Sequence, residues 1–346
     1  MKKVFIWLAV VSLIAVFSIV GCKAEEVSEE AEAVEEAVEE VVASEGDDVY
    51  TFAFVPGILD PFYINLQKGF EYAAESMGIE TITQIPEAWD PAVQTPIIDV
   101  LMTRGDIDLL ITAPTDKEGM IEVLKRVDDS DVPVITVDTY IGDGIYEEGH
   151  PAAFPISYIG SKNTEGGAMC ADALAEAIGY KGKVYAQATT PGVSTGDQRI
   201  LGFEQGISAY PDIEYIGLDY NDDDIASSTS QTTAVLEREP DLAGIFANNT
   251  MGGAGAGLAV QNAGLEGEVK VICFDATQEA AENLEKGVIS MALAQKPFDM
   301  GLFAVIAGYA YLEGVEQIPI RIPTGYVVIT KDSMNDPEIS KWIYQE

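Results

Sequence analysis

Polar side chains follow five short apolar segments of this chain, each at the point where the segment ends. These five residues are Asp60, Asp138, Asn249, Asp275 and Gln295. Any one of them could be a helix N-cap or a turn residue, because Asp and Asn are common in both places. In open α/β sheets, however, ligands bind at the carboxyl ends of the strands. Since the five residues come from two successive sets of segments, they converge only if the sets face each other across a cleft.

The chemistry available at such a cleft is hydrogen bonding to hydroxyl groups. Carboxylates accept strong hydrogen bonds from hydroxyls, and the amides of Asn and Gln can both donate and accept. Phe62 and Tyr63 follow Asp60 closely, and their rings could cover the apolar face of a ligand. The alternative is that both rings are core residues in the first turn of a helix. The residue types therefore favour a small neutral molecule that carries several hydroxyl groups.

The elements that must position these residues alternate between strands and helices. Apolar, β-rich runs predict strands at 50–55, 80–85, 108–112 and 134–137, and then at 156–160, 183–188, 213–218, 242–247, 269–274 and 290–294. Helical patterns lie between them, and an irregular piece, 141–155, separates the two sets. A repeated strand–helix order indicates mostly parallel sheets with helices on both faces. We therefore expect an α/β protein with two Rossmann-like lobes.

Composition excludes several classes of function. The chain has 346 residues and a formal net charge of −39, so it lacks the basic surface that nucleic acids require. His150 is the only histidine, so the chain has too few histidine side chains to favour a metal site or a His-dependent triad. No G-x-G-x-x-G follows the first strand, and no Walker A or G-x-S-x-G motif is present. Cys170 and Cys273 fit two buried free thiols, although a disulfide is also compatible with an exported protein.

The N-terminus has the layout of an export signal. A basic start, Met1-Lys2-Lys3, precedes an apolar run at 4–20 and then Gly21-Cys22. The end of this segment resembles a bacterial lipobox, which predicts a signal peptide at 1–22 and lipidation of Cys22. An uncleaved membrane anchor is the alternative, because the apolar run is just long enough to span a bilayer. Residues 23–48 contain Glu, Ala and Val but no aromatic residue, and we interpret them as an acidic tether.

Six short motifs in the body resemble the periplasmic sugar-binding proteins of bacterial ABC importers, of the ribose- and galactose-binding type. In order along the chain they are D-P-F-Y (60–63), P-V-I-T-V-D (133–138), Q-R-I-L-G-F (198–203), F-A-N-N (246–249), V-I-C-F-D (271–275) and A-L-A-Q (292–295). The resemblance implies a type I periplasmic binding protein fold with a three-segment hinge, crossing near 158–161, 295–297 and 324–327. Lobe 1 would comprise 49–159 plus 296–325, and lobe 2 would comprise 160–295 plus 326–346.

The resemblance also implies roles for individual residues. Phe62 and Tyr63 would flank the sugar ring, and Arg199 would be the arginine of lobe 2. The hydroxyl-binding set would be Asp138, Asn249, Asp275 and Gln295, whereas Asp60 stands where the family often has Asn. Thr139 stands where ribose binders carry an arginine, which puts ribose itself in doubt. The family's second aromatic has no certain counterpart, and Tyr220 is a candidate for it. Trp89, on the loop after the second strand, could add a stacking face.

We therefore expect a lipid-anchored, monomeric solute-binding protein without a cofactor or catalytic activity. It would capture a neutral monosaccharide or polyol and deliver it to the membrane subunits of an ABC permease. The acids of the site disfavour phosphosugars and uronates. Two alternatives stay open: a binding protein for a furanose-like autoinducer or another small polar solute, and a sugar sensor that feeds a chemoreceptor or a histidine kinase.

Overall fold

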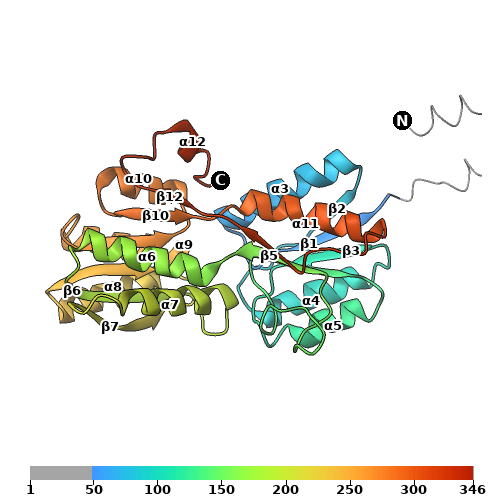
Figure 1. Ribbon diagram of the computed structural model, residues 1–346, viewed down its shortest axis with the longest axis horizontal. Coiled ribbons are helices and arrows are strands. Elements are labelled where there is room, and N and C mark those ends of the chain that lie inside the picture. Colours follow the sequence, from blue (N-terminus) through green and yellow to red (C-terminus); the bar gives the residue numbers. More distant parts are fainter. Residues whose placement is uncertain (1–48, 346) are drawn as a thin grey trace, which may run out of the picture. The chain divides into compact units, whose positions relative to one another are not determined.

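The computed structural model describes residues 49–345. The predicted signal peptide (1–22) with Cys22, and the predicted tether (23–48), lie outside the described residues. Tyr50–Glu346 forms one compact unit that contains two six-stranded sheets (Figure 1). Among residues 49–345, no helix is long and apolar enough to cross a membrane.

The first sheet is wholly parallel and has the order β11-β5-β4-β3-β1-β2. Its strands are β1 (Thr51–Val55), β2 (Glu80–Thr83), β3 (Leu109–Thr112), β4 (Val134–Val137), β5 (Ser157–Ser161) and β11 (Arg321–Thr324). The helices α3 (Pro61–Met77) and α11 (Pro297–Leu312) pack in one core cluster, and α4 (Pro91–Met102) and α5 (Ile121–Asp128) pack in another. The central strands are buried on both faces, as expected of a parallel sheet covered by helices on both sides.

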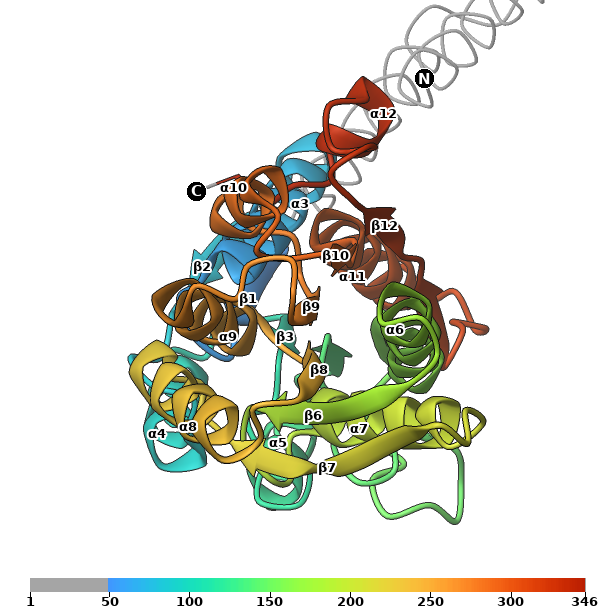
Figure 2. The same ribbon diagram turned by 90° about the vertical axis from the view of Figure 1, so that its left-hand side faces the viewer.

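The second sheet has the order β12-β10-β9-β8-β6-β7 and one antiparallel pair, β10 with β12. Its strands are β6 (Gly182–Ala188), β7 (Ile213–Tyr220), β8 (Leu242–Ala247), β9 (Lys270–Phe274), β10 (Met291–Ala294) and β12 (Val327–Ile329). Its helices are α6 (Asn163–Ala177), α7 (Ser194–Ile207), α8 (Ile225–Arg238), α9 (Thr250–Ala263), α10 (Gln278–Lys286) and α12 (Pro337–Ser340). Figure 2 shows α8 and α9 on one side of this sheet and α6 and α7 on the other. The expected α/β fold with two lobes is therefore confirmed.

The chain passes between the two sheets three times: between β5 and α6, between β10 and α11, and between β11 and β12. The first passage follows Ser161, two residues after the expected lobe boundary at 159. The reason is that Gly160 and Ser161 still pair with Pro323 and Thr324 of β11. The other two passages lie at 295–296 and 325–326, inside the expected ranges.

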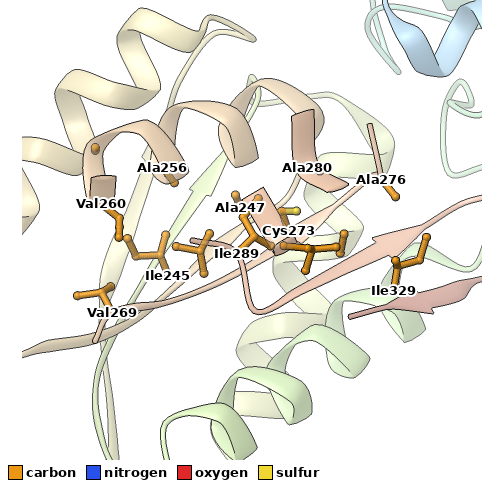
Figure 3. Close-up of a cluster of buried hydrophobic side chains, with 14 of the residues drawn as sticks. Ile245, Ala247, Ala256, Val260, Val269, Cys273, Ala276, Ala280, Ile289 and Ile329 are labelled. Carbon is orange, nitrogen blue, oxygen red and sulfur yellow. The ribbon is translucent and has the colours of Figure 1, made fainter. Parts of the chain in front are cut away.

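Both cysteines of the body are buried free thiols. Cys273 lies in β9 among apolar side chains that include Ile245, Ala247 and Ala256 (Figure 3). Burial raises the pKa of both thiols, because the thiolate would lose its hydration. Of the two readings of the cysteines, the structure therefore has the free thiols and no disulfide between Cys170 and Cys273.

Close helix contacts in each lobe depend on glycines. In lobe 1, α3 and α11 lie side by side (Figure 1), and a Cβ atom at Gly301 would overlap the carbonyl oxygen of Leu66. A Cβ atom at Gly69 would likewise overlap the carbonyl oxygen of Phe298. Lobe 2 repeats this arrangement between α6 and α7, through Gly167 and Gly202. Larger residues would force these helices apart and displace the strand-end loops that they support.

We expect Gly301→Ala to lower the free energy of unfolding by roughly 1–3 kcal/mol, because the overlap outweighs the gain in helix propensity. Gly257→Ala, within α9, is the matched control: its Cβ would make only ordinary 3.4 Å contacts. That variant should keep or raise the stability. Urea unfolding followed by circular dichroism measures both, and equal stability of the two variants would contradict the close-packing argument.

Candidate ligand-binding site

A cleft between the two lobes has an empty volume of about 460 Å³ and is open to solvent. Lobe 1 lines the cleft with Ile58, Asp60, Phe62, Tyr63, Trp89 and Asp138. Lobe 2 lines it with Thr189, Val193, Thr195, Arg199, Asp223, Asn249, Thr250 and Asp275, and Gln295 lies at the second passage between the lobes. Of the eleven predicted site residues, the structure brings nine together here; Thr139 and Tyr220 do not line the cleft.

Asp60 is placed by the start of α3. It is the N-cap of that helix, and its Oδ1 accepts a hydrogen bond from the backbone N–H of Tyr63 at 2.8 Å. Pro61 occupies the first helical position, where its missing N–H costs nothing. Burial raises the pKa of Asp60 well above its usual range, although the hydrogen bond from Tyr63 opposes the shift. The sequence Asp-Pro therefore fixes both a helix start and a carboxylate in the cleft.

Three aromatic side chains form the lobe 1 wall. Phe62 and Tyr63 are each 4% exposed and belong to the core cluster of α3 and α11, so they are core residues that also line the cleft. Trp89 lies beside Tyr63, with ring centroids 6.0 Å apart, and its Nε1–H donates to the carbonyl of Thr115 at 2.9 Å. This hydrogen bond satisfies the polar end of the indole and leaves its ring for an apolar contact.

Asp138 follows β4 directly and adopts a left-handed backbone conformation, with φ of 59°. Its Oδ2 accepts a hydrogen bond from the Tyr63 hydroxyl at 2.7 Å. Burial raises the pKa of Asp138 to about 6, although the positive charge of Arg199 opposes that rise. The next residue, Thr139, turns away: its hydroxyl donates to the carbonyl of Pro114 at 2.7 Å. Thr139 therefore does not line the cleft, and its side chain anchors a neighbouring loop instead.

Arg199, in α7, is almost fully buried at the cleft. Its Nε–H donates to Asn163 at 2.8 Å and its Nη1 donates to the carbonyl of Asn248, also at 2.8 Å. The guanidinium lies 4.2 Å from the ring centroid of Phe274. No carboxylate lies within ion-pair distance of Arg199 in the part of the chain that the structure describes. A buried cation held by neutral partners keeps its remaining N–H groups available for a ligand.

Asp275 follows β9 and also has a left-handed backbone, with φ of 69°. Its Oδ1 accepts hydrogen bonds from Gln295 Nε2 and from the Tyr344 hydroxyl, both at 2.9 Å. Its Oδ2 lies 3.3 Å from the Thr250 hydroxyl, which donates to it. The Oε1 atom of Gln295 is buried and has no hydrogen-bond partner within residues 49–345. Gln295 thus orients the carboxylate and offers an acceptor of its own.

The structure adds Asp223, which the sequence reasoning missed. Its Oδ1 accepts a hydrogen bond from Asn249 Nδ2 at 2.5 Å, and Asn249 itself caps α9 through Gly252 N–H. Burial raises the pKa of Asp223 to about 6, and the hydrogen bond from Asn249 opposes the rise. The expected strand end at 218 hid this residue, because β7 continues to Tyr220 and the polar run after it is the strand-end loop. Tyr220 therefore ends the strand, is 38% exposed and lies beside Leu201 on another face.

Unpaired acceptors dominate the cleft. Within the described residues, one carboxylate oxygen each of Asp60, Asp138 and Asp223 accepts no hydrogen bond. A ligand that carries several hydroxyl donors would satisfy these oxygens. Four carboxylates against one guanidinium oppose anionic ligands, and no three acidic, His or Cys side chains in residues 49–345 are arranged to hold a metal ion. The polar cleft with one aromatic wall therefore fits a neutral polyhydroxylated molecule.

Comparison with known proteins agrees with this geometry. The chain matches the periplasmic binding protein domain over residues 52–316, and it belongs to that family. The family consists of exported, periplasmic solute-binding proteins that are transport components and not enzymes, so the expectation of no catalytic activity is confirmed.

Individual relatives cover nearly the whole described body. A crystal structure of an ABC transporter solute-binding protein from Agrobacterium vitis, bound with alpha-D-tagatopyranose, is 42% identical and superimposes with a TM-score of 0.84 over 86% of this chain and 100% of that chain. One from Burkholderia graminis, in complex with D-arabinose, is 28% identical with a TM-score of 0.77 over 83% and 97% of the two chains. The ribose import binding protein RbsB of Haemophilus influenzae is 28% identical over 291 residues, which are 84% of this chain and 94% of that protein. The resemblance to sugar-binding proteins of ABC importers is confirmed.

The raised pKa of Asp138 predicts a pH-dependent stability of the sugar-free protein. Its carboxyl has a pKa of about 6 in the folded state, against an ordinary value of 3.8. Its ionisation therefore destabilises the fold above pH 6, by about 3 kcal/mol, and the penalty vanishes as the pH falls below about 4. Asp138→Asn cannot ionise, yet its amide oxygen can still accept from Tyr63. We expect this variant to melt at a higher temperature than the wild type at pH 7.5, with the difference shrinking at pH 5.

Differential scanning calorimetry at the two pH values measures the effect. Asp332→Asn, at an exposed carboxylate, is the control and should leave both melting temperatures nearly unchanged. A stabilisation by Asp138→Asn that is equal at pH 5 and pH 7.5 would show that packing, and not ionisation, is responsible.

Proposed function

We propose that this protein captures a neutral monosaccharide or a similar polyol between its two lobes and delivers it to the membrane subunits of an ABC permease. The observation that carries this proposal is the set of unpaired carboxylate oxygens in a cleft with aromatic rings on one wall. Two relatives bound to D-tagatose and D-arabinose support the substrate class. The particular sugar is left to experiment.

The proposed mechanism is closure of the lobes around the ligand. Hydroxyl groups would bridge Asp60 and Asp138 of lobe 1 to Asp223 and Asp275 of lobe 2, while one face of the sugar ring packs on the aromatic wall. Because these contacts exist together only when the lobes are closed, the ligand shifts the open–closed equilibrium toward the closed form. The closed form would then present both lobes to the permease.

The cleft is complete within one chain, which supports action as a monomer. The Asn249–Asp223 pair supports a polar lobe 2 wall, so that only one face of the sugar would stack on aromatic rings. Sedimentation of the purified protein at micromolar concentration tests the monomeric state, and a stable dimer would contradict it.

The proposal predicts which ligands stabilise the protein. Neutral pentoses, hexoses and polyols should include at least one that raises the melting temperature, whereas sugar phosphates and uronates should not, because four carboxylates repel them. A ligand at a hundredfold excess over its dissociation constant stabilises the folded state by about 2.7 kcal/mol. Thermal-shift screening of the full-length chain, followed by calorimetry of the best ligand, measures this.

Asp223→Ala is the matched binding-site variant for this screen. Its side chain has one hydrogen-bond partner within residues 49–345, Asn249, so the fold should survive the change. We expect it to lose most of the sugar response. A response to sugar phosphates alone would refute the proposed ligand class, and a response to a furanose-like autoinducer preparation alone would move the function to that solute.

We also propose that Cys22 carries a lipid that anchors the protein at the outer side of the cytoplasmic membrane. The lipobox-like residues that precede Cys22 support this, and the acidic residues 23–48 would act as a spacer. Cys22→Ser should release the protein into the soluble fraction of cells, or leave an unprocessed precursor of higher mass. Wild-type membrane association and mass in Cys22→Ser would contradict lipidation.

A further inference from the structure

The last residues of the chain contact both lobes. We call residues 342–345 the C-terminal strap. On the lobe 2 side, the backbone N–H of Tyr344 donates to the carbonyl of Ala276 at 2.8 Å, directly after Asp275. On the lobe 1 side, the carbonyl of Gln345 accepts hydrogen bonds from Asn65 Nδ2 at 2.9 Å and from Lys68 Nζ at 3.3 Å, both on α3. The strap is therefore bonded to both lobes.

The ring of Tyr344 completes this bridge. It is 3% exposed, belongs to the core cluster of lobe 1 and meets Phe62 edge-on, with ring centroids 5.9 Å apart. Phe62 is one of the three aromatic residues that line the cleft. The ring of Tyr344 thus packs against the aromatic wall of lobe 1, while the backbone of the same residue is hydrogen-bonded to lobe 2.

The hydroxyl of Tyr344 has a defined direction of hydrogen bonding. It accepts from the backbone N–H of Gln295 at 2.9 Å, and an N–H can only donate. Its own proton therefore goes to Oδ1 of Asp275, at 2.9 Å. The same Oδ1 accepts from Gln295 Nε2. These three residues form a closed set of hydrogen bonds at the second passage between the lobes, and Asp275 Oδ2 accepts from the hydroxyl of Thr250, which also lines the cleft.

We propose that Tyr344 is a positioning residue for ligand binding: its hydroxyl holds the carboxylate of Asp275 and the passage residue Gln295 in the orientation that binds the ligand. The carboxylate must meet a hydroxyl within hydrogen-bond distance, and without Tyr344 one of its two Oδ1 donors is lost. The strap also links this orientation to closure, because movement of the lobes must alter its contacts with Phe62, Asn65 or Ala276. A role limited to anchoring the C-terminus is the competing explanation.

The chain offers a matched control for the test. The hydroxyl of Tyr146, 5% exposed in lobe 1, also accepts from a backbone N–H, that of Ile141 at 3.2 Å, and bonds a side chain, Thr136 Oγ1 at 2.7 Å. It does not line the cleft. Tyr344→Phe and Tyr146→Phe therefore each remove one buried hydroxyl with two partners. Both variants should lower the melting temperature by a similar amount, so stability alone cannot explain a difference in binding.

Two measurements on the full-length chain then decide the role. The first is the dissociation constant of the sugar that binds most tightly in a panel of D-tagatose, D-arabinose, D-ribose and D-allose. This measurement rests on the proposed function. We expect Tyr344→Phe to weaken binding about tenfold, mainly through a faster dissociation rate, and Tyr146→Phe to leave it unchanged. The second is the ¹⁵N-resolved NMR signal of the Gln295 backbone and side-chain amides in the sugar-free protein. The backbone signal must shift in Tyr344→Phe, because its direct bond to the hydroxyl is lost. The side-chain amide bonds Asp275 and not Tyr344, so its signal tests the positioning role: it should shift in Tyr344→Phe and not in Tyr146→Phe.

The outcomes separate this inference from the proposed function. If the wild type binds a sugar and Tyr344→Phe binds it equally tightly, the positioning role is overturned. If equal weakening occurs in both variants, the effect is one of general stability and the role is likewise overturned. If the wild type binds no sugar of the panel, the proposed function fails for these sugars, and the Gln295 side-chain amide signal alone decides: an unchanged signal in Tyr344→Phe overturns the inference, and a shifted signal supports it.

Discussion

The main constraint on this structure is the cost of burying carboxylates between two lobes. Asp138 and Asp275 are each about 95% buried, and with Asp60 and Asp223 they surround a cleft in which Arg199 is the one cation among the lining residues 58–295. Taking a carboxylate out of water is costly unless hydrogen bonds replace its hydration. The protein supplies only part of these bonds, through Tyr63, Asn249, Gln295 and Tyr344. The remaining oxygens are what a ligand must satisfy.

The rest of the fold serves to hold these groups in place. Asp60 and Asn249 are N-caps whose side chains bond their own helices, so their positions follow from the starts of α3 and α9. Asp138 and Asp275 adopt left-handed backbone conformations directly after parallel strands. Such conformations are uncommon for residues other than glycine and cluster at functional sites, where the surrounding structure sustains them. Parallel strands flanked by close-packed helices provide that surrounding rigidity in both lobes.

Much of the site could be predicted because its residues stand directly after buried strands. Asp138, Asp275 and Gln295 follow apolar runs that end within one residue of the observed strand ends. Asp223 could not be found from the same rule while β7 was expected to end at 218, since its last two residues, Asp219 and Tyr220, interrupt the apolar pattern but still pair with β6. Sequence position does not show which way a side chain turns, and Thr139 lies outside the cleft because its hydroxyl donates to the carbonyl of Pro114.

The contacts of Tyr344 could not be predicted from the sequence around it. This residue lies 15 residues beyond the end of β12, yet its partners are at positions 62, 275, 276 and 295. No periodicity or motif links such distant positions, because the contact arises only when both sheets and the passages between them are assembled.

The same long-range assembly explains how one cleft can serve both recognition and closure. In the proposed mechanism, the carboxylates that are costly to bury without a ligand are those that a hydroxylated ligand would satisfy, so the ligand would stabilise the closed arrangement more than either lobe alone. A tightly neutralised site, with each carboxylate paired to a cation, would be more stable when empty and would close without a ligand. In the proposed mechanism, the shortage of positive charge around Asp60, Asp138 and Asp223 would make closure depend on the ligand.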